Sequence, residues 1–451
     1  MAVDTRSSSG ERVLDVDGAS LWSRSSNRFS GTQVLDSEES ADVAIVGGGL
    51  TGLSTALHLR EKGYECVVIE AGKPGDGATG RAGGLVAPDF VIDTVASISQ
   101  RFGPRQGERF ARLVGSSAKT TFDLIAEYRI DCQHQQQGFV VPAASKSATR
   151  SLDDRGKQWR SLGFPVTTLD EKGTHASIGT SLYRTALYFE QGGALNPLAY
   201  ATGLAETVSG MGARVFVNSP VNELRRVGRR WRVLTNGGSV DAERVVLAAN
   251  DGNLKLHPAL QNTAVPMLVY EYATRVLTTE EVRHNMGSAL PYTDRQPYLF
   301  TARLDSESRL ISALPGLLTA RRAGAILSEA SSRLGRFYPG LDSPSVECIW
   351  QGVAYLNADL LPAIYAPEGT LDLLAVQACN GRGIALNTAV GREIASVFES
   401  DNEDTSSIPI TRPKKIRYYK LAKRTPAMLM TIARIGDRFS KAWTRDDIVN
   451  R

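Results

Sequence analysis

Three glycines and one glutamate carry the clearest chemical signal in this sequence. Gly47, Gly49 and Gly52 occupy the G-x-G-x-x-G positions directly after the apolar run 43–46, and Glu70 directly follows the next apolar run. In this spacing the first glycine permits a tight turn, the second lets a pyrophosphate approach the backbone, and the third lets a helix pack closely on a strand. The carboxylate can accept hydrogen bonds from ribose hydroxyls. The pattern predicts a dinucleotide site and leaves NAD and FAD both open.

A strand, a helix and a second strand must position these residues. Residues 42–46 (DVAIV) are rich in β-branched side chains, which is typical of a parallel strand covered on both faces. A helix is expected to follow the glycines and to end at Gly63, and a second strand is expected over 65–70. Strand, motif, helix, strand and acid occur in order, so a chance glycine-rich turn is the weaker interpretation.

The segment that follows favours a flavin. Residues 73–88 (KPGDGATGRAGGLVAP) are mostly small and show neither helix nor strand periodicity. Such a loop lets backbone lie against a flat ring with few intruding side chains. No second G-x-G-x-x-G follows a strand elsewhere in the chain, so a separate nicotinamide site is not expected. FAD is therefore the predicted cofactor, and no metal is predicted.

The same loop resembles that of a known family. Residues 77–84 (GATGRAGG) are similar to the GASGRNGG loop of the D-amino acid oxidase superfamily of FAD enzymes, within it the γ-glutamylputrescine oxidase-like amine oxidases. The likeness runs from about residue 41 to 398, and residues 371–398 resemble the family's GFSGHGLAL strand, turn and helix, with Arg382 where histidine is common. It implies an α/β fold: a Rossmann-type FAD-binding domain with an inserted α+β substrate domain on a large mixed sheet.

The motif and the resemblance together divide the chain. The FAD-binding domain is expected over 36–90, 191–259 and 346–400, and the substrate domain over 91–190 and 260–345. The residues expected to contact FAD are Gly47, Gly49, Leu50, Thr51, Gly52, Glu70, Ala71, Gly77, Ala78, Thr79, Gly80, Arg81, Gly83, Gly84, Leu85, Val221, Ala249, Asn250, Gly381, Arg382, Gly383 and Ile384.

The substrate side is expected to be a sheet over the flavin. Residues 265–277 read as a strand, and residues 297–314 read as two strands divided by a polar DSES turn. Relatives acting on α-amino acids hold the carboxylate with an arginine in a stretch that resembles 352–367, where this chain has Ala354. A bidentate carboxylate clamp cannot come from alanine, so the resemblance favours an amine without an α-carboxylate. Arg303 is the alternative carboxylate partner.

The reaction implied is FAD-dependent oxidative deamination of a primary or secondary amine. Hydride passes to flavin N5, the imine hydrolyses to an aldehyde, and O2 is the expected acceptor. The first alternative is an amino-acid dehydrogenase that passes electrons to a membrane quinone, and the second is a flavin-bearing partner protein without small-molecule catalysis. Ile311 stands where related sarcosine oxidases have a lysine that promotes reaction with oxygen. Catalytic roles are expected for Arg382, Arg303, Tyr270 and Tyr355, and pocket-shaping roles also for Tyr272, Tyr298 and Trp350.

Two features of the 377–384 segment have competing interpretations. Arg382 can add positive charge where a reduced flavin gathers negative charge, or it can be a surface arginine paired with an acid. Cys379 lies in the same turn, although a covalent flavin link is not indicated. The four cysteines form no CxxC pair, which favours a reducing, cytoplasmic setting. Neither a signal peptide in residues 1–40 nor a membrane-spanning apolar run is expected.

The basic residues are concentrated near the C-terminus. Residues 411–445 contain eleven Lys or Arg against one acid, a net +10, which leaves −6 for the rest of a chain whose total is +4. Nucleic-acid binding by the whole protein is therefore not expected. A polar linker is expected over 399–410, followed by an amphipathic helix over 427–443. Its apolar stripe is Met428, Ile432, Ile435, Phe439 and Trp443, and Arg434, Arg438, Lys441 and Arg445 lie opposite.

Two interpretations of this tail remain open. Residues 411–445 can form an interfacial helix on an anionic membrane, which would place a membrane-associated enzyme near a quinone. Alternatively the helix packs its apolar stripe on the body and leaves a basic face in solvent.

Overall fold

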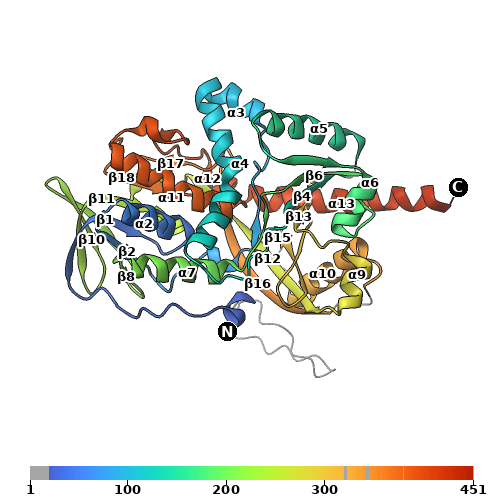
Figure 1. The fold of residues 1–451 in the computed structure, drawn as a ribbon, viewed down its shortest axis with the longest axis horizontal. Helices are drawn as coiled ribbons and strands as arrows, with labels where there is room; N and C mark the ends of the chain where they lie inside the picture. Colours follow the sequence, from blue (N-terminus) through green and yellow to red (C-terminus); the bar gives the residue numbers. More distant parts are fainter. Residues whose placement is uncertain (1–19, 144, 319–321, 342–344, 379, 450–451) are drawn as a thin grey trace.

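Two large sheets stand side by side in the protein (Figure 1). The structure is a computed structural model that describes residues 20–143, 145–318, 322–341, 345–378 and 380–449. A nine-stranded sheet carries the glycine motif, and an eight-stranded sheet carries the segments expected to face the substrate. A two-stranded ribbon, β3 (Leu85–Val86) with β7 (Gly193–Ala194), adds a third, small sheet.

The nine-stranded sheet has the strand order of a dinucleotide-binding fold. Its order is β19-β17-β18-β11-β1-β2-β8, and the hairpin β9–β10 pairs through β10 with the first part of β11. The five strands β18, β11, β1, β2 and β8 are mutually parallel. The strand bounds are β1 Glu38–Val46, β2 Cys66–Ile69, β8 Arg214–Phe216, β9 Glu223–Val227, β10 Arg230–Leu234, β11 Ser239–Leu247, β17 Ile364–Tyr365, β18 Leu373–Val376 and β19 Ile410–Thr411.

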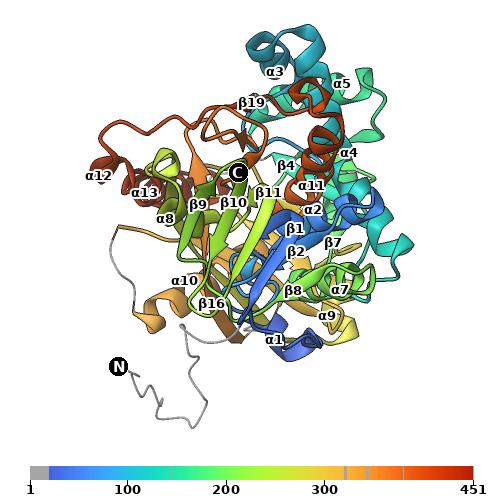
Figure 2. The same cartoon turned by 90° about the vertical axis from the view of Figure 1, so that its left-hand side faces the viewer.

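Both faces of this sheet are covered, which explains the apolar composition of its strands. In β1, Val43 and Ile45 pack with residues of the helices α2 (Leu50–Glu61), α7 (Pro197–Gly210) and α11 (Gly383–Ser400). Their neighbours Ala44 and Val46 pack on the opposite side, in a cluster that includes residues of β10 and α8 (Asn253–Leu256). Figure 2 looks across this sheet, with α2 and α11 on one side and α8 on the other.

The eight-stranded sheet is mixed, with the order β16-β12-β15-β14-β13-β4-β6-β5. Only β13 and β4 pair in parallel among its described neighbours. The strands are β4 Phe139–Ala143, β5 Val166–Leu169, β6 Thr185–Phe189, β12 Ala264–Val276, β13 Tyr292–Thr293, β14 Thr301–Leu304, β15 Arg309–Pro315 and β16 Val346–Asn357. The expected strand over 265–277 and the expected pair of strands over 297–314 are therefore confirmed.

The remaining helices surround the two sheets. The long helix α4 contacts α11 and α3, and α10 packs against one face of the eight-stranded sheet (Figure 1). Their bounds, with the other short elements, are α1 Trp22–Ser25, α3 Val95–Phe102, α4 Pro104–Glu127, α5 Lys146–Ser161, α6 Glu171–Ile178, α9 Thr279–Asn285, α10 Ala323–Phe337, α12 Tyr419–Ala422, α13 Thr425–Val449, and the 3₁₀ turns Thr79–Arg81, Asn250–Gly252, Pro258–Leu260 and Glu403–Thr405.

The expected fold class is confirmed, and two segments lie elsewhere than expected. Residues 346–357 form β16, which pairs along its length with β12 and so belongs to the eight-stranded sheet. Residues 399–410 are not a free linker: the Arg109 guanidinium donates to the carbonyls of Asp404 and Thr405, and β19 pairs with β17 at the edge of the nine-stranded sheet. The sequence pattern missed the first because β16 begins at the expected boundary between the two domains, where composition does not show to which sheet a strand belongs. It missed the second because residues 399–410 are polar but are held through their backbone carbonyls and through strand pairing.

In the described part of the chain, no helix is long and apolar enough to cross a membrane.

Candidate active site

The glycine motif forms a tight corner between β1 and α2. Gly47 has φ +112°, and a Cβ there would lie 2.7 Å from the Ala248 carbonyl oxygen at the end of β11. A Cβ on Gly52 would lie 2.0 Å from the Gly47 carbonyl oxygen, so only glycine lets the helix start this close to the strand. Gly49 is the N-cap of α2, and the helix begins with Leu50 and Thr51. Free N–H groups at this end suit a phosphate.

This corner lies where the order of the sheet reverses. From β1 the chain goes first to β2 and β8 on one side, and later to β11 and β18 on the other. In open parallel sheets, ligands bind at the carboxyl ends of the strands at such a switch point. The corner after β1, the end of β2 and the end of β11 meet at this edge.

Glu70 lies against the corner, as its position after β2 predicted. Its carboxylate accepts hydrogen bonds from the backbone N–H of Gly48 (2.6 Å) and of Gly72 (2.8 Å). Burial raises the pKa of Glu70, and these two N–H donors lower it in part. Its carbonyl accepts from Ser219 N (2.8 Å), which brings the segment containing Val221 beside it. The arrangement gathers Glu70, Ala71 and Val221 at one end of the site.

The small-residue loop, residues 77–85, is held in place by side chains from distant parts of the chain. The Trp22 indole donates to the Ala82 carbonyl (2.9 Å), and the Trp350 indole donates to the Arg81 carbonyl (3.0 Å). The two indoles pack edge to face, with ring centroids 5.9 Å apart. Arg303 Nη1 donates to the Gly84 carbonyl (3.2 Å) and to the Leu195 carbonyl (2.7 Å). These bonds fix the carbonyls of the loop, here called the cofactor loop.

A chain of asparagines joins the cofactor corner to the segment after β18. The buried Asn253 amide donates to the carbonyls of Leu247 and Val376, at the ends of β11 and β18. Asn250, with φ +53°, accepts from Ala378 N (3.3 Å). Asn380, with φ +50°, accepts from Asn357 N (3.0 Å) at the end of β16. The 377–384 turn is therefore bonded to β16 through Asn380 and to the Asn250–Gly252 turn after β11 through Ala378. Cys379, in the same turn, lies outside the described residues.

The comparison with known proteins settles the family. The model of the family described as "DAO: FAD dependent oxidoreductase" matches residues 42–397. The chain belongs to the DAO family of FAD dependent oxidoreductases. The gamma-glutamylputrescine oxidoreductase of Escherichia coli (strain K12) is 28% identical over 395 residues, covering 85% of this chain and 90% of the relative. The expected family is confirmed.

Solved structures support the DAO fold. The chain matches glycine oxidase from Geobacillus kaustophilus with a TM-score of 0.68 and 20% identity, over 87% of this chain and 98% of that chain. It matches L-proline dehydrogenase from P. horikoshii with a TM-score of 0.69 and 18% identity, over 81% of this chain and 95% of that chain. At these identities the likeness concerns the fold alone. With the family match, the chain is an FAD-dependent enzyme.

The residues at the corner fit a DAO cofactor. The glycines leave room where any Cβ would collide with backbone, and Gln377 supplies an independent observation. Its side chain is buried, and neither its amide nitrogen nor its amide oxygen has a hydrogen-bond partner among the described residues. A buried amide without a partner is costly. Gln377 begins the 377–384 turn, and a bound cofactor with a donor and an acceptor at this position would supply both partners.

The eight-stranded sheet presents different residues on its two faces. Successive strand residues alternate in direction, so Glu271, Ala273, Ile311, Arg303 and Trp350 share the face toward the cofactor loop, called the inner face. A Cβ on Gly83 would lie 2.9 Å from the Glu271 carboxylate. Burial raises the pKa of Glu271 to about 8, while nearby Arg303 and the Gly83 N–H lower it.

Two expected catalytic tyrosines lie on the other face. Tyr270 pairs with Leu314 and packs in the cluster that includes α10, and buried Tyr272 is in the same cluster. Tyr355 pairs with Pro266 and so shares the direction of Tyr270. Burial raises the pKa of Tyr355 to about 12, with Asp251 nearby. The side chains of Tyr270 and Tyr355 therefore point to the face of the sheet opposite to that of Glu271.

Arg303 and Arg382 have different surroundings. Arg303 is buried on the inner face, its guanidinium lies 4.9 Å from the Trp22 ring, and burial lowers its pKa to about 10. Its Nη1 bonds to backbone carbonyls, so Arg303 serves to hold the cofactor loop. Arg382 is the N-cap of α11 and lies 5.3 Å above the Phe139 ring. Burial also lowers the pKa of Arg382 to about 10.

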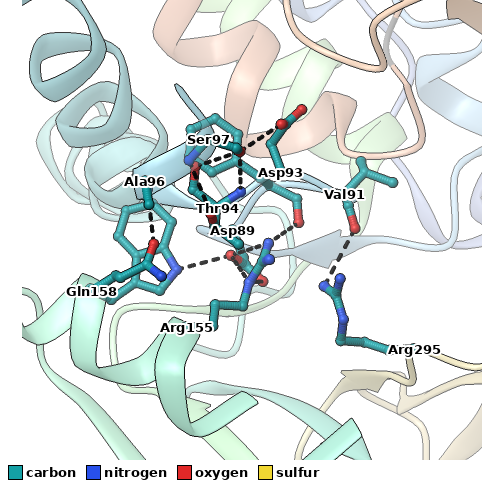
Figure 3. Close-up of polar contacts among 11 residues, drawn as sticks. Asp89, Val91, Asp93, Thr94, Ala96, Ser97, Arg155, Gln158 and Arg295 are labelled. Atoms are coloured by element: carbon teal, nitrogen blue, oxygen red, sulfur yellow. Dashed lines mark hydrogen bonds and ion pairs between the residues drawn. The ribbon is translucent and has the colours of Figure 1, made fainter. Parts of the chain in front are cut away.

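Arg382 belongs to a cationic group around a buried ion pair. Arg155 donates from Nε to both Asp89 carboxylate oxygens at 2.9 Å, and Trp159 donates to the same carboxylate. Figure 3 shows this pair and Arg295, which points toward the Val91 carbonyl. The negative charge of Asp89 raises the pKa of Arg382, and the positive charge of Arg295 lowers it. Within the described residues Arg382 has no carboxylate at ion-pair distance, so the interpretation as an acid-paired surface arginine is not supported.

The sequence patterns missed several residues of this site. Trp22 lies in the polar segment 1–40, where a single tryptophan among serines and charges was the only signal. Glu271 lies between Tyr270 and Tyr272, and the sequence pattern favoured the tyrosines because aromatic residues are common in ligand pockets. Asn253, Gln377 and Asn380 act through bonds to distant backbone, which no local pattern indicates.

Proposed function

We propose that the protein oxidises a primary or secondary amine to an imine, which water hydrolyses to an aldehyde. Bound FAD would take up the hydride and so supply the redox chemistry. The relatives support this class of substrate: one is named gamma-glutamylputrescine oxidoreductase and another, from Bacillus licheniformis, glycine oxidase. We also propose that the glycine corner, the cofactor loop, Val221, Asn250 and the 377–384 turn hold FAD.

The observation that carries this proposal is the position of Glu271. It is a carboxylate on the inner face, beside the Gly83 backbone of the cofactor loop, with a pKa raised to about 8 by burial. An alkylamine is a cation at neutral pH, because its pKa is close to that of a lysine. In the ionised fraction, which grows as the pH rises through about 8, Glu271 can bind the ammonium group. With its raised pKa it can also accept the proton that the amine must lose before it gives up a hydride.

An α-amino acid substrate is less well supported than a simple amine. Ala354 pairs with Met267 and so faces inward, at the place where the resemblance would put a carboxylate-binding arginine. Arg303, the alternative, already donates to two carbonyls. Ala354 has no donor for such a clamp, and Arg303 uses Nη1 to hold backbone carbonyls, although its buried Nε has no hydrogen-bond partner among the described residues. We therefore propose a substrate without a carboxylate next to its amine.

The second candidate differs in its electron acceptor. Ile311 is buried beside Trp22 and Trp350, on the inner face where a lysine would favour reaction with oxygen. This observation favours a quinone as acceptor, whereas the oxidase resemblance favours O2. We propose O2 as the first candidate and a membrane quinone as the second.

Anaerobic titration of the purified holoprotein tests the proposal. Polyamines, γ-glutamyl amines, N-methyl amines and amino acids are added in turn, and bleaching of the flavin absorbance is followed. We expect at least one carboxylate-free or distally acidic amine to reduce the flavin stoichiometrically, and O2 or a soluble quinone then to reoxidise it. Reduction by α-amino acids alone would contradict the proposed substrate class. Absence of reduction by any amine would favour a non-catalytic flavoprotein.

A further inference from the structure

The C-terminal helix α13 is fastened to the body through its polar residues. Arg434 donates from Nε to the Glu329 carboxylate of α10 (3.0 and 3.1 Å), and Asp437 accepts from Arg336 (2.7 Å). Thr431 Oγ1 accepts from Leu318 N (3.2 Å). Upstream, the Tyr419 hydroxyl donates to the Ala264 carbonyl at the start of β12 (2.9 Å). Arg434, expected on a solvated basic face, thus faces the protein.

The apolar stripe of the helix is left in solvent as a result. Met428, Ile432 and Ile435 follow one another at helical spacing and are 43%, 58% and 50% exposed. Of the twelve exposed large apolar side chains in the described part of the chain, six lie between residues 418 and 435, which marks this as a patch and not a scatter: Tyr418, Leu421, Met428, Leu429, Ile432 and Ile435. An amphipathic helix that turns its apolar face outward requires a partner for that face.

The segment before the helix is strongly and uniformly cationic. Residues 412–424 contain seven Lys or Arg and no acid. All seven are exposed, and none of them is in an ion pair with a described residue: Arg412, Lys414, Lys415, Arg417, Lys420, Lys423 and Arg424. The rest of the chain outside 411–445 has a net charge of −6, so this charge is a property of the patch.

We propose that residues 412–437 bind the surface of an anionic lipid membrane. The Met428–Ile432–Ile435 stripe would enter the boundary between headgroups and acyl chains, and the cations of 412–424 would lie among the anionic headgroups. Binding is peripheral. The proposal does not depend on the amine reaction, since every residue that carries it lies outside the candidate active site.

A second copy of the chain fits this patch less well. A two-fold contact places the same surface of each copy against itself. Seven unpaired cations would then face seven identical cations beside the shared apolar stripe, which is unfavourable. An anionic bilayer complements both the charge and the apolar stripe at once, so we assign the patch to lipid.

Cosedimentation of the full-length holoprotein with vesicles tests this assignment. Vesicles of phosphatidylcholine with about one third phosphatidylglycerol are compared with pure phosphatidylcholine, at low and high salt. We expect binding to the anionic vesicles, at least about tenfold weaker binding to the neutral ones, and loss of most binding at high salt. Replacing Met428, Ile432 and Ile435 together by Gln should weaken binding about tenfold or more. Replacing Lys414, Lys415, Lys420 and Lys423 together by Gln should also weaken binding about tenfold or more.

The matched control replaces equally exposed apolar residues elsewhere, Val34→Gln, Val227→Gln and Val276→Gln, whose exposures are 45%, 53% and 46%. This variant should bind the vesicles like the wild type. All variants should keep the flavin absorbance and the anaerobic reduction rate of the parent. The assignment fails if the wild type does not bind anionic vesicles at low salt, or if the control loses as much binding as the stripe variant. It also fails if sedimentation equilibrium shows a dimer that only the stripe variant disrupts, because the patch would then belong to a second copy.

Discussion

The corner after β1 and the inner face of β12 are the two halves of the candidate active site that we propose, and they are built in different ways. At the corner, positions are set by backbone: glycines that leave no room for Cβ atoms, and N–H groups that meet Glu70. On the inner face, positions are set by side chains that arrive from strands and from the N-terminal α1. We expect the backbone half to tolerate fewer changes of residue than the side-chain half, because an added Cβ at Gly47 or Gly52 would collide with backbone.

The largest effect should follow a change at the corner itself. Gly52→Ala puts a Cβ 2.0 Å from the Gly47 carbonyl oxygen, so β1 and α2 must separate. We expect the fraction of purified protein that carries FAD to fall by more than about tenfold. Absorbance near the flavin maximum, relative to total protein, measures this. Gly210→Ala, in α7, is the control and should stay yellow, because an added Cβ there meets no other atom within 4 Å. An equally yellow Gly52→Ala protein would show that the corner is not rigid.

Removing the charge on the inner face should have the next largest effect. Below about pH 8 the Glu271 carboxyl is protonated and above it ionised, so flavin reduction by an amine should rise through about pH 8 in the wild type. Glu271→Gln should lower the reduction rate constant about 100-fold at pH 9 and remove this rise. Anaerobic stopped-flow measurements over pH 6 to about 10 follow it.

Stability supplies a second measurement on Glu271. Its pKa is higher in the folded protein than in the unfolded chain, so its contribution to stability is complete at low pH and is lost as pH rises through about 8. The Tm of Glu271→Gln should therefore exceed that of the wild type increasingly on the alkaline side. Glu347→Gln, an exposed position of β16, is the control for both measurements. Unchanged pH profiles in Glu271→Gln would remove this residue from the proposed chemistry.

A smaller effect is expected where the two halves meet. Trp22→Phe keeps a ring in the cluster but removes the donor to the Ala82 carbonyl. Losing one such bond should weaken FAD binding about five- to tenfold, as titration of the apoprotein with FAD would measure. Trp231→Phe, in β10 of the nine-stranded sheet, removes an equivalent indole bond, to Asp372 just before β18, and should leave FAD affinity unchanged. Equal losses in both variants would mean that Trp22 contributes only general stability.

The smallest effect is expected at the start of α11. Arg382→Met removes a half-buried cation that we propose to stabilise the reduced flavin. The midpoint potential should fall by about 30 mV, which for a two-electron couple corresponds to a factor of about ten in the equilibrium constant. Arg392→Met, an exposed position on the same helix, should leave the potential unchanged. A shift of the same size in the control would assign the effect to the net charge of the protein.

The contrast between the two halves explains what could be predicted from the sequence. Backbone sites have local signatures, so Gly47, Gly52 and Glu70 were recognisable from spacing alone, as were β12, β14 and β15 from their composition. It was harder to predict toward which face of the sheet each strand residue points. Tyr270 and Glu271 are adjacent, and only the pairing register and the packing of α10 decide which one faces the cofactor loop.

The tail shows a second limit of pattern reading. The stripe Met428, Ile432 and Ile435 was visible in the sequence, but a helical period does not state which face meets the protein. Ion pairs of Arg434 and Asp437 with α10 decide it in favour of the polar face. These partners are far away in the chain and have no local signature.

The packing of Trp22 on Trp350 has a consequence for how the protein is made. Trp22 is synthesised long before Trp350 and before the strand β18 that completes the parallel core. Two of the three side chains described above as holding the cofactor loop, Arg303 and Trp350, are therefore still missing when Trp22 and the loop have been synthesised. Since long-range contacts of this kind form late, we expect the cofactor loop to reach its final position only after Trp350 has been synthesised and has packed on Trp22.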